Sequence, residues 1–285
     1  MKRTTLAAFA ATVLAMGSLA ACSSDSTTTE TEEIEQSAEA GEGTVCDANV
    51  YIVRHGQTEA NVAAVVSGWS DSPLTEEGIA QAEAAGAALA GTQFDTALTS
   101  DLKRASDTAT IVLASAGSDI EPVEVEVLRE QNYGGFDGGS DIDMWVPIME
   151  GMGYTFDESK GEPGDFWGNP DALDWYYSVD EEDVMDTLAE VDPAGEAEDW
   201  DTYQTRMNEA IATVAQAAEE SGCGNVLVVS HGGTIGSMLT LMDPEGYQGE
   251  SIGNASISHL LYRDGEFTVQ EAGVDPEEWG GQPQS

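Results

Sequence analysis

Two histidines of the chain each follow a short apolar run and lie among residues that can bind anions. Arg54 and His55 come directly after residues 49–53, and His231 comes directly after residues 225–230. Short, almost unbroken apolar runs of this kind are typical of buried parallel strands. Because such strands deliver the residues that follow them to one edge of a sheet, we expect the two histidines to share a site. A nucleophilic nitrogen beside positive side chains is suited to phosphoryl transfer.

The chain has few basic residues, so the possible role of each can be considered separately. The chain has 9 Lys+Arg, and two of them, Lys2 and Arg3, lie in the first 22 residues, so 9 − 2 = 7 remain beyond that segment. These seven are Arg54, Lys103, Arg104, Arg129, Lys160, Arg206 and Arg263. Arg54 and Arg104 lie at predicted strand ends and are our candidates for gripping phosphate oxygens. Ordinary salt bridges to the abundant acids are the alternative for both.

The acidity of the chain excludes some classes of partner. The formal net charge is −45, which makes a nucleic acid an unexpected partner and anionic lipid headgroups unattractive. Hydrophobic residues still make up 41% of the chain, so the acids mark a charged surface around a packed core. The 285 residues fit one α/β domain with non-globular ends. Acid clusters such as residues 180–183 lack the spacing of a calcium loop, so no metal site is expected.

Strand and helix patterns alternate along much of the chain. This alternation predicts an α/β three-layer sandwich, with a mostly parallel sheet flanked by helices. Strands are expected at residues 49–53, 94–99 and 225–230, helices at 75–91, 102–115 and 199–220, a half-exposed edge strand at 123–127, and a terminal hairpin at 256–270. We place the domain at residues 45–275 and a tail at 276–285.

The alternation breaks down between residues 139 and 194. This segment is rich in Gly, Pro and Asp, yet it contains a large share of the aromatic residues, from Trp145 to Tyr177. We interpret it as an insertion that caps one end of the sheet. Its aromatic side chains would form either the core of a small domain or a wall of the substrate site.

The first 22 residues are typical of an export signal. A basic start is followed by an apolar stretch and then by Leu19-Ala20-Ala21-Cys22, which resembles a bacterial lipobox. The resemblance implies cleavage before Cys22 and acylation of its sulfur, and an ordinary secretory signal is the alternative. Residues 23–44 are acidic and rich in Ser and Thr, and we expect a solvated, disordered tether. The protein is therefore expected on the extracytoplasmic face of a bacterial membrane, held there only by the lipid.

The other two cysteines are spaced alike from the two histidines. Cys46 lies nine residues before His55, and Cys223 lies eight residues before His231. If the histidines end neighbouring parallel strands, this spacing brings both sulfurs to the opposite end of the sheet. We expect a disulfide in an oxidising compartment, with two buried free thiols as the alternative.

Five sequence blocks follow one another at the predicted strand ends. They are residues 54–61 (Arg-His-Gly-Gln-Thr-Glu-Ala-Asn), 68–69 (Gly-Trp) with 73–78 (Pro-Leu-Thr-Glu-Glu-Gly), 100–105 (Ser-Asp-Leu-Lys-Arg-Ala), 128–130 (Leu-Arg-Glu) and 230–233 (Ser-His-Gly-Gly). In this order they resemble the histidine phosphatase superfamily, in its phosphoglycerate mutase-like branch. The segment Gly195-Glu196 followed by Arg206 is also similar to the family, although Ala197 stands where its members usually have Ser.

The resemblance implies a role for each matching residue. His55 would be the nucleophile and form a phosphohistidine, with its other nitrogen held by a backbone carbonyl, that of Gly56. Arg54 and Arg104 would grip the phosphate oxygens, and His231 would add a third positive donor, being protonated when phosphate is bound.

The leaving group needs an acid, and the resemblance assigns this role to Glu130. A surface carboxylate without function is the alternative for Glu130. Asn61 and the backbone near Gly68 and Gly232 match positions that line the phosphate pocket. The implied reaction uses no cofactor.

These residues predict an exported phosphomonoesterase that acts on a phosphorylated small molecule. Gln57-Thr58 is more similar to the phosphatases of the family than to the mutases, which usually have Glu-Ser there. A phosphoglycerate mutase-type phosphotransferase and a non-catalytic surface lipoprotein that binds a phosphate ligand are the alternatives. His259 lies outside every block, and we interpret it as structural.

Overall fold

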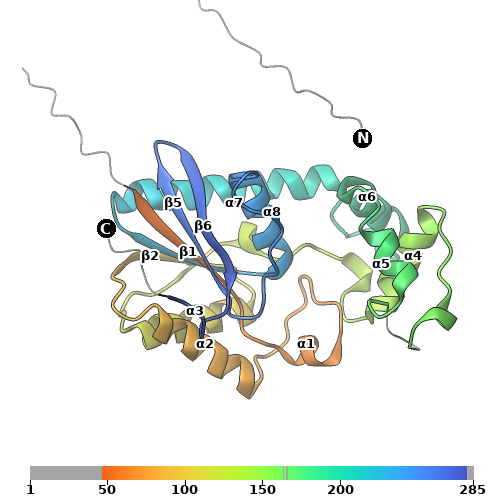
Figure 1. Cartoon of the computed structure of the whole chain (residues 1–285), viewed down its shortest axis with the longest axis horizontal. Coiled ribbons are helices and arrows are strands. Elements are labelled where there is room, and N and C mark those ends of the chain that lie inside the picture. The colour runs from red at the N-terminus through yellow and green to blue at the C-terminus, as the bar shows by residue number, and fades with distance from the viewer. Residues whose placement is uncertain (1–46, 163, 165, 281–285) are drawn as a thin grey trace, which may run out of the picture. The chain divides into compact units, whose positions relative to one another are not determined.

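The computed structural model describes residues 47–162, 164 and 166–280 (Figure 1). Six strands form one sheet in the order β3-β2-β4-β1-β5-β6. The parallel part consists of β1 (Ala48–Arg54), β2 (Phe94–Thr99), β3 (Val123–Glu124) and β4 (Asn225–Ser230). The hairpin of β5 (Ile257–Arg263) and β6 (Glu266–Val274) adds an antiparallel edge. The mostly parallel sheet that the sequence predicts is confirmed.

Helices cover both faces of this sheet (Figure 1). On one face, α2 (Glu76–Ala88) and α3 (Lys103–Ala116) pack on Tyr51 and Val53 of β1. On the other face, α7 (Trp200–Ser221) and α8 (Gly232–Met242) pack on Val50 and Ile52. Because successive side chains of a strand point to opposite faces, one apolar run supplies both layers of the core.

The helices on the sheet begin where the sequence provides capping side chains. The Thr75 side chain accepts a hydrogen bond from the backbone N–H of Gly78 and caps α2. Asp199 accepts one from the N–H of Thr202 and caps α7 in the same way. Such caps satisfy backbone donors that have no partner within the helix. Both helices begin within one residue of the predicted start.

The predicted edge strand at residues 123–127 is present at the edge of the sheet but is shorter than expected. Only β3 pairs with β2, and the chain then turns through a 3₁₀ helix, η1 (Glu126–Leu128). The turn buries the Leu128 side chain completely. The carbonyl of Val127 accepts a hydrogen bond from the Arg206 guanidinium instead of from a neighbouring strand. The last backbone hydrogen bond to β2 is that of the Val125 N–H to the Thr99 carbonyl, so the pairing ends before the residue that contacts Arg206.

The insertion is helical. It contains α4 (Asp141–Gly151), η3 (Glu158–Lys160), α5 (Pro170–Tyr176) and α6 (Glu181–Val191). Its core is separate from the two cores on the sheet and includes Ile148, Phe166, Trp175 and Leu188. The Gly, Pro and Asp residues that obscured the helical period serve as caps and turns: Asn169 caps α5, for example, and Pro170 occupies its first turn.

The folded part extends beyond the predicted boundary at residue 275. The Trp279 ring lies 6.3 Å from the Tyr51 ring and 6.5 Å from the His259 ring, as centroid distances. Trp279 is the one large apolar side chain of residues 276–285, and it covers an aromatic surface that the sheet leaves open. Hydrophobic burial therefore holds the start of the predicted tail on the domain.

Several predictions made for the N-terminal segment fall on residues outside the described ranges. They concern the signal, the tether, Cys22 and Cys46. Cys223 is disulfide-bonded, and its pairing with Cys46 stays a prediction. Within the described ranges, no helix combines the length and the apolar character needed to cross a membrane.

Candidate active site

The two predicted histidines lie side by side where β1 and β4 end. Arg54 of β1 is in register with Ser230 of β4, so His55 and His231 leave adjacent parallel strands at the same edge. Their ring centroids are 5.1 Å apart, and both side chains are buried. The strand pairing thus creates the histidine pair directly.

His55 is oriented by a backbone carbonyl. Its Nδ1 lies 2.8 Å from the carbonyl oxygen of Gly56, the contact expected from the sequence. Because a carbonyl only accepts hydrogen bonds, Nδ1 must carry the proton, and Nε2 keeps its lone pair. Burial, and then the charges of Arg104 and Arg54, hold the pKa of His55 well below its usual value. A neutral imidazole with a free Nε2 is the form that a nucleophile requires.

His231 is buried completely, and neither of its ring nitrogens has a hydrogen-bond partner in the protein. Burial lowers the pKa of His231 well below its usual value, and Arg104 and His55 add to this effect. The free protein therefore holds a neutral His231. The protonated form predicted for the phosphate-bound state would need the negative charge of the ligand.

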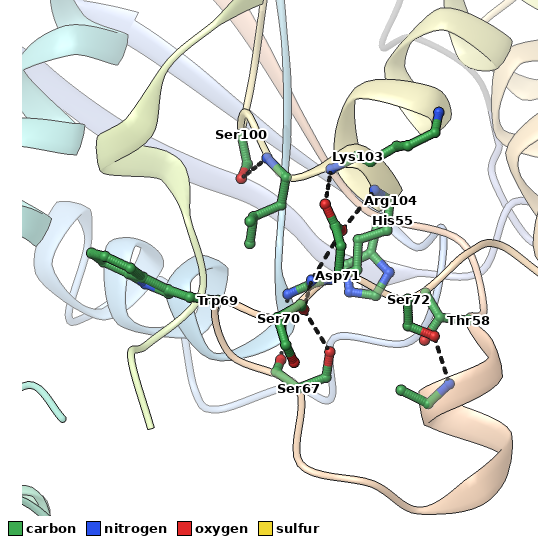
Figure 2. Close-up of polar contacts among 12 residues, drawn as sticks. His55, Thr58, Ser67, Trp69, Ser70, Asp71, Ser72, Ser100, Lys103 and Arg104 are labelled. Atoms are coloured by element: carbon green, nitrogen blue, oxygen red, sulfur yellow. Dashed lines mark hydrogen bonds and ion pairs between the residues drawn. The ribbon is translucent and has the colours of Figure 1, made fainter. Parts of the chain in front are cut away.

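Arg104 lies in the first turn of α3 and is only 1% exposed. Its guanidinium donates hydrogen bonds to the carbonyls of Gly68 (2.7 Å) and Ser70 (2.8 Å). Figure 2 shows that the loop containing Ser70 and Asp71 lies against Arg104 and close to His55. The carboxylate of Asp71 also accepts a 2.7 Å hydrogen bond from the Lys103 N–H (Figure 2). These contacts fix the guanidinium in one orientation.

Asp137 holds this loop in place. Its carboxylate accepts hydrogen bonds from the N–H groups of Gly68 (2.6 Å), Trp69 (2.8 Å) and Ser70 (2.8 Å). The N–H of Gly68 is thus engaged by Asp137 and its carbonyl supports Arg104, while the backbone near Gly68 reaches the smaller of the two cavities described below at Ser67. Gly68 itself lies behind the arginine and lines neither cavity.

Arg54 approaches the site from the end of β1. Its Nη1 donates a 2.8 Å hydrogen bond to the carbonyl of Ile252, and its Nε has no partner. A Cβ atom at Gly232 would lie 3.2 Å from this Nε, so a glycine keeps the backbone of α8 close to the guanidinium. The predicted position of Gly232 in the pocket agrees with this contact.

Unpaired buried polar atoms gather at these side chains. Among the described residues, the buried side-chain atoms without a hydrogen-bond partner are Arg54 Nε, Arg104 Nε, both ring nitrogens of His231, Gln131 Nε2, Trp175 Nε1 and Ser256 Oγ. Most of them belong to the three residues predicted to surround phosphate. Buried donors without partners are rare because each costs about 1–3 kcal/mol. An anion placed between these groups would satisfy them.

Glu130 is no surface carboxylate, because its side chain is 8% exposed. Its Oε2 accepts a 3.0 Å hydrogen bond from the N–H of Gly233, and its Oε1 accepts one of 3.0 Å from the N–H of Thr234. Both donors belong to the first turn of α8, next to His231. The arrangement aims the carboxyl group at the site.

Two adjoining cavities meet at residues that line both of them: Arg54, Glu130, Tyr133, Met144, Trp145 and Trp167. The smaller cavity has a volume of about 270 Å³ and is also lined by His55, Asn61 and Arg104. The larger has a volume of about 1140 Å³ and extends between the helical insertion, α8 and residues 247–252. The smaller cavity is therefore lined by Arg104 and His55, Arg54 borders both cavities, and the larger one provides space for the rest of a substrate.

The remaining predicted residues fall inside and outside this site. Asn61 belongs to the short helix α1 (Glu59–Ala63), and its side-chain oxygen accepts hydrogen bonds from the N–H of Thr58 and from Asn254. His259 lies in β5, stacked on Tyr51 with a centroid distance of 4.8 Å, and bonds Asn49. Its position fits the structural interpretation. Within the described ranges, no three His, Cys, Asp or Glu side chains are grouped so as to hold a metal ion.

Arg206 is a site residue to which sequence reasoning gave no role. It donates hydrogen bonds to the carbonyls of Arg129 (2.8 Å) and Glu130 (3.2 Å). Its guanidinium also pairs with both carboxylate oxygens of Glu198, at 2.7 and 2.6 Å. The buried ion pair therefore positions the backbone of the predicted acid. The segment that ends in Arg206 was noticed in the sequence, but its contact with Glu130 depends on the packing of α7.

We expect Arg206→Met to lower the free energy of unfolding by about 3–5 kcal/mol, because Glu198 would stay buried without its counter-ion. Urea unfolding followed by circular dichroism measures this loss. Arg263→Met is the matched control, since the Arg263 ion pair with Asp47 is exposed and its removal should cost less than about 1 kcal/mol. Equal losses in the two variants would contradict the assigned role of Arg206.

The buried histidines give a second expectation. His55 and His231 should stay neutral through pH ~6.5, where a free histidine titrates, and addition of inorganic phosphate should raise the pKa of His231. Below pH ~6.5 the imidazoles of the unfolded chain take up protons, whereas the buried imidazoles of the folded protein do not. Each histidine should therefore lower the free energy of unfolding by about 1.4 kcal/mol for every pH unit below this value. Nitrogen-15 NMR of the imidazoles measures the pKa values directly. Titration of both rings near pH ~6.5 in the free protein would refute the expectation.

Comparison with known proteins extends over most of the described chain. A model of the histidine phosphatase superfamily (branch 1) matches residues 50–158 and 167–275. The 2,3-bisphosphoglycerate-dependent phosphoglycerate mutase of Cytophaga hutchinsonii is 33% identical over 192 residues, which are 67% of this chain and 75% of that protein. The enzyme of the same name from Sinorhizobium fredii is 32% identical over 202 residues, covering 68% of this chain and 79% of that protein.

Solved structures share the fold. The phosphoglycerate mutase of Bacillus anthracis superposes with a TM-score of 0.70 at 30% identity, over 81% of this chain and 94% of that one. A mycobacterial glucosyl-3-phosphoglycerate phosphatase superposes with a TM-score of 0.55 at 22% identity, over 80% of this chain and 99% of that one. At this lower identity the likeness concerns the fold alone.

Proposed function

Since the chain belongs to the histidine phosphatase superfamily (branch 1), we propose that it is an exported phosphomonoesterase that works through a phosphohistidine on His55. Phosphoglycerate mutases and phosphatases are both among the proteins similar to it, so the family leaves the choice between transfer and hydrolysis open. The proposal of hydrolysis rests on the charges around the larger cavity.

In the first proposed step, the Nε2 lone pair of His55 attacks phosphorus while the bond from phosphorus to the alcohol oxygen breaks. Glu130 donates a proton to that oxygen, so the alcohol leaves as a neutral molecule. In the second step, a water molecule attacks the phosphohistidine, the bond between phosphorus and Nε2 breaks, and Glu130 takes a proton from the water. Phosphate is released, and His55 returns to its neutral form.

Arg54, Arg104 and His231 would stabilise the negative charge on the phosphate oxygens in both steps. Their unpaired donors point to this role, because they need no reorganisation before an anion binds. His231 would take up a proton as the phosphate group enters.

Hydrolysis is proposed because, among the described residues, the larger cavity is lined by no basic side chain besides Arg54. The other basic residues of the described ranges all form ion pairs with carboxylates: Lys103 with Asp107, Arg104 with Asp71, Arg129 with Asp101, Lys160 with Asp171, Arg206 with Glu198, and Arg263 with Asp47. A phosphoglycerate mutase must hold a carboxylate as well as a phosphate group. This site offers that carboxylate no cation of its own.

Hydrolysis and transfer are separated by one assay. The protein is incubated with 3-phosphoglycerate, with and without 2,3-bisphosphoglycerate, and with p-nitrophenyl phosphate. Release of phosphate from p-nitrophenyl phosphate without formation of 2-phosphoglycerate supports the phosphatase. Rapid formation of 2-phosphoglycerate that depends on the bisphosphate would establish the mutase and overturn the proposal. Binding of phosphate without either reaction would leave the non-catalytic lipoprotein.

We further propose that the protein is anchored outside the cytoplasm through a lipid on Cys22. The sequence Leu19-Ala20-Ala21-Cys22 and the disulfide of Cys223 support this location, because disulfides persist in oxidising compartments. Detergent phase partitioning of the protein expressed in a bacterial host tests the anchor. Cys22→Ser should move the protein from the detergent phase to the aqueous phase, and an unchanged distribution would refute the anchor.

The charge of the protein leads to a prediction about salt. With a formal net charge of −45, the surface repels a dianionic ester at long range. Because the Debye length shortens from about 30 Å at 0.01 M salt to about 8 Å at 0.15 M, kcat/KM should rise with moderate ionic strength or with divalent cations. Steady-state hydrolysis of p-nitrophenyl phosphate over this range measures the effect. A flat or falling response would contradict it.

A further inference from the structure

The larger cavity has an aromatic wall contributed by the insertion. Trp145, Trp167 and Tyr176 line it, and their ring centroids are 5.2–5.5 Å apart. The rings meet edge to face, so the wall is a packed unit formed by α4, α5 and the segment between them. Trp145 and Trp167 line the smaller cavity as well, together with Tyr133, so the wall reaches the phosphate end, and Tyr176 lines the larger cavity alone.

Carboxylates complete the same cavity. Glu181, the first residue of α6, and Glu250, in the segment after α8, both line it. Glu181 forms no ion pair with a basic residue of the described ranges, and, although part of its surface is exposed to solvent, partial burial raises its pKa. A carboxylate that loses hydration without gaining a counter-ion is destabilised, and a cation from outside the protein would compensate this loss.

We propose that the larger cavity binds a leaving group that carries an ammonium group, so that the preferred substrates are phosphomonoesters of amino alcohols, including those with a quaternary nitrogen. This inference rests on the proposed phosphatase function and names its substrate class. The phosphate group would occupy the smaller cavity between Arg54, Arg104 and the histidines, and the ammonium group would lie among the aromatic rings and Glu181.

Two physical effects favour a cationic group there. The faces of Trp and Tyr rings attract ammonium ions, and a nearby carboxylate adds Coulomb attraction that is stronger where water is partly excluded. The long-range field acts in the same direction. An ester with an ammonium group has a smaller net negative charge than a simple phosphate ester, so the acidic surface opposes its approach less.

The test compares two esters of the same shape, phosphocholine and 3,3-dimethylbutyl phosphate, which differ in having nitrogen or carbon at the branched centre. We expect kcat/KM for phosphocholine to exceed that for the neutral ester by about tenfold, as for a cation held by rings and a carboxylate. Glu181→Gln should remove most of this preference. Glu182→Gln is the matched control, because Glu182 is the next residue of α6, is exposed like Glu181 but does not line the cavity, and its substitution changes the net charge by the same amount.

Equal rates for the two esters in the unmodified protein would overturn the inference. The inference would also be overturned if the preference for phosphocholine were equally large in Glu181→Gln and Glu182→Gln. The preference would then come from the overall negative charge of the surface and not from Glu181. If even p-nitrophenyl phosphate is not hydrolysed, the proposed function itself fails. The dissociation constants of the two esters, measured by calorimetry, then decide the inference, and equal constants would refute it.

Discussion

Replacing His55 by alanine is expected to reduce the release of phosphate by a factor of about 10³ to 10⁶, the range seen when an enzyme loses its nucleophile. The imidazole supplies the only group in the smaller cavity whose free nitrogen is proposed to bond to phosphorus, and the alanine side chain offers no replacement. Steady-state hydrolysis of p-nitrophenyl phosphate measures the loss. Rapid quenching of the unmodified protein should also trap a phosphoryl group that is stable to alkali and labile to acid, as expected of phosphohistidine.

His259→Gln is the control for the loss of an imidazole. His259 is buried like His55, but it lies in β5 away from the cavities and bonds the side chain of Asn49, which glutamine can also do. This variant should keep its activity and form the same phosphorylated intermediate. Activity of His55→Ala close to that of the unmodified protein would refute the assignment of the nucleophile.

Glu130→Gln is expected to have an effect that depends on the leaving group. General acid catalysis contributes about 10² to 10⁴ in rate, so hydrolysis of an alkyl phosphate should slow by that amount. The loss should be much smaller for p-nitrophenyl phosphate, since p-nitrophenolate leaves without a proton. Glutamine keeps the size of the side chain and one oxygen that can accept from the N–H of Gly233 or Thr234.

The ratio of the two rates is the decisive measurement for Glu130. A similar loss for both esters would indicate that the substitution disturbs the site as a whole and would contradict the role of proton donor. Glu126→Gln is a suitable control, because Glu126 lies in the preceding η1 turn and pairs with Arg129 at an exposed position. It should leave the rate ratio unchanged.

The sequence was sufficient for the elements whose signal is local. The apolar runs before His55 and His231 predict β1 and β4, and the parallel pairing of these strands brings the two histidines together. The contact between His55 and the Gly56 carbonyl was expected from the family resemblance and is present. Caps at Thr75 and Asp199 mark helix starts because each depends only on residues three positions away.

Features that depend on distant contacts could not be predicted in this way. The chain leaves the edge strand for the η1 turn, in which the carbonyl of Val127 accepts a hydrogen bond from Arg206, 79 residues away in the chain. The helical periods of the insertion are interrupted by Gly, Pro and Asp residues, and its core forms only when the helices meet. Asp137 supports the loop beside Arg104, yet among 54 acidic residues nothing in its immediate neighbours distinguishes it.

The roles of Gly68 and Glu130 illustrate, within the site, the difference between features that depend on local sequence and features that depend on distant contacts. Both belong to recognisable blocks, so their presence near the site was predicted. Which atom of Gly68 faces which partner depends on Asp137 and Arg104, and the sequence alone did not reveal these two contacts. For Glu130, burial against the first turn of α8 excludes the surface alternative, and only the folded structure provides that information.

The unpaired donors of Arg54, Arg104 and His231 also affect the stability of the protein. Folding removes these donors from water without giving them a protein partner, so the empty protein is less stable than its packing alone would allow. Any inorganic phosphate that binds there stabilises the native state by mass action, by about 2.7 kcal/mol at a concentration one hundred times its dissociation constant. The product of the reaction would thus also protect the fold. In surroundings poor in phosphate, the same protein would be more readily unfolded and degraded.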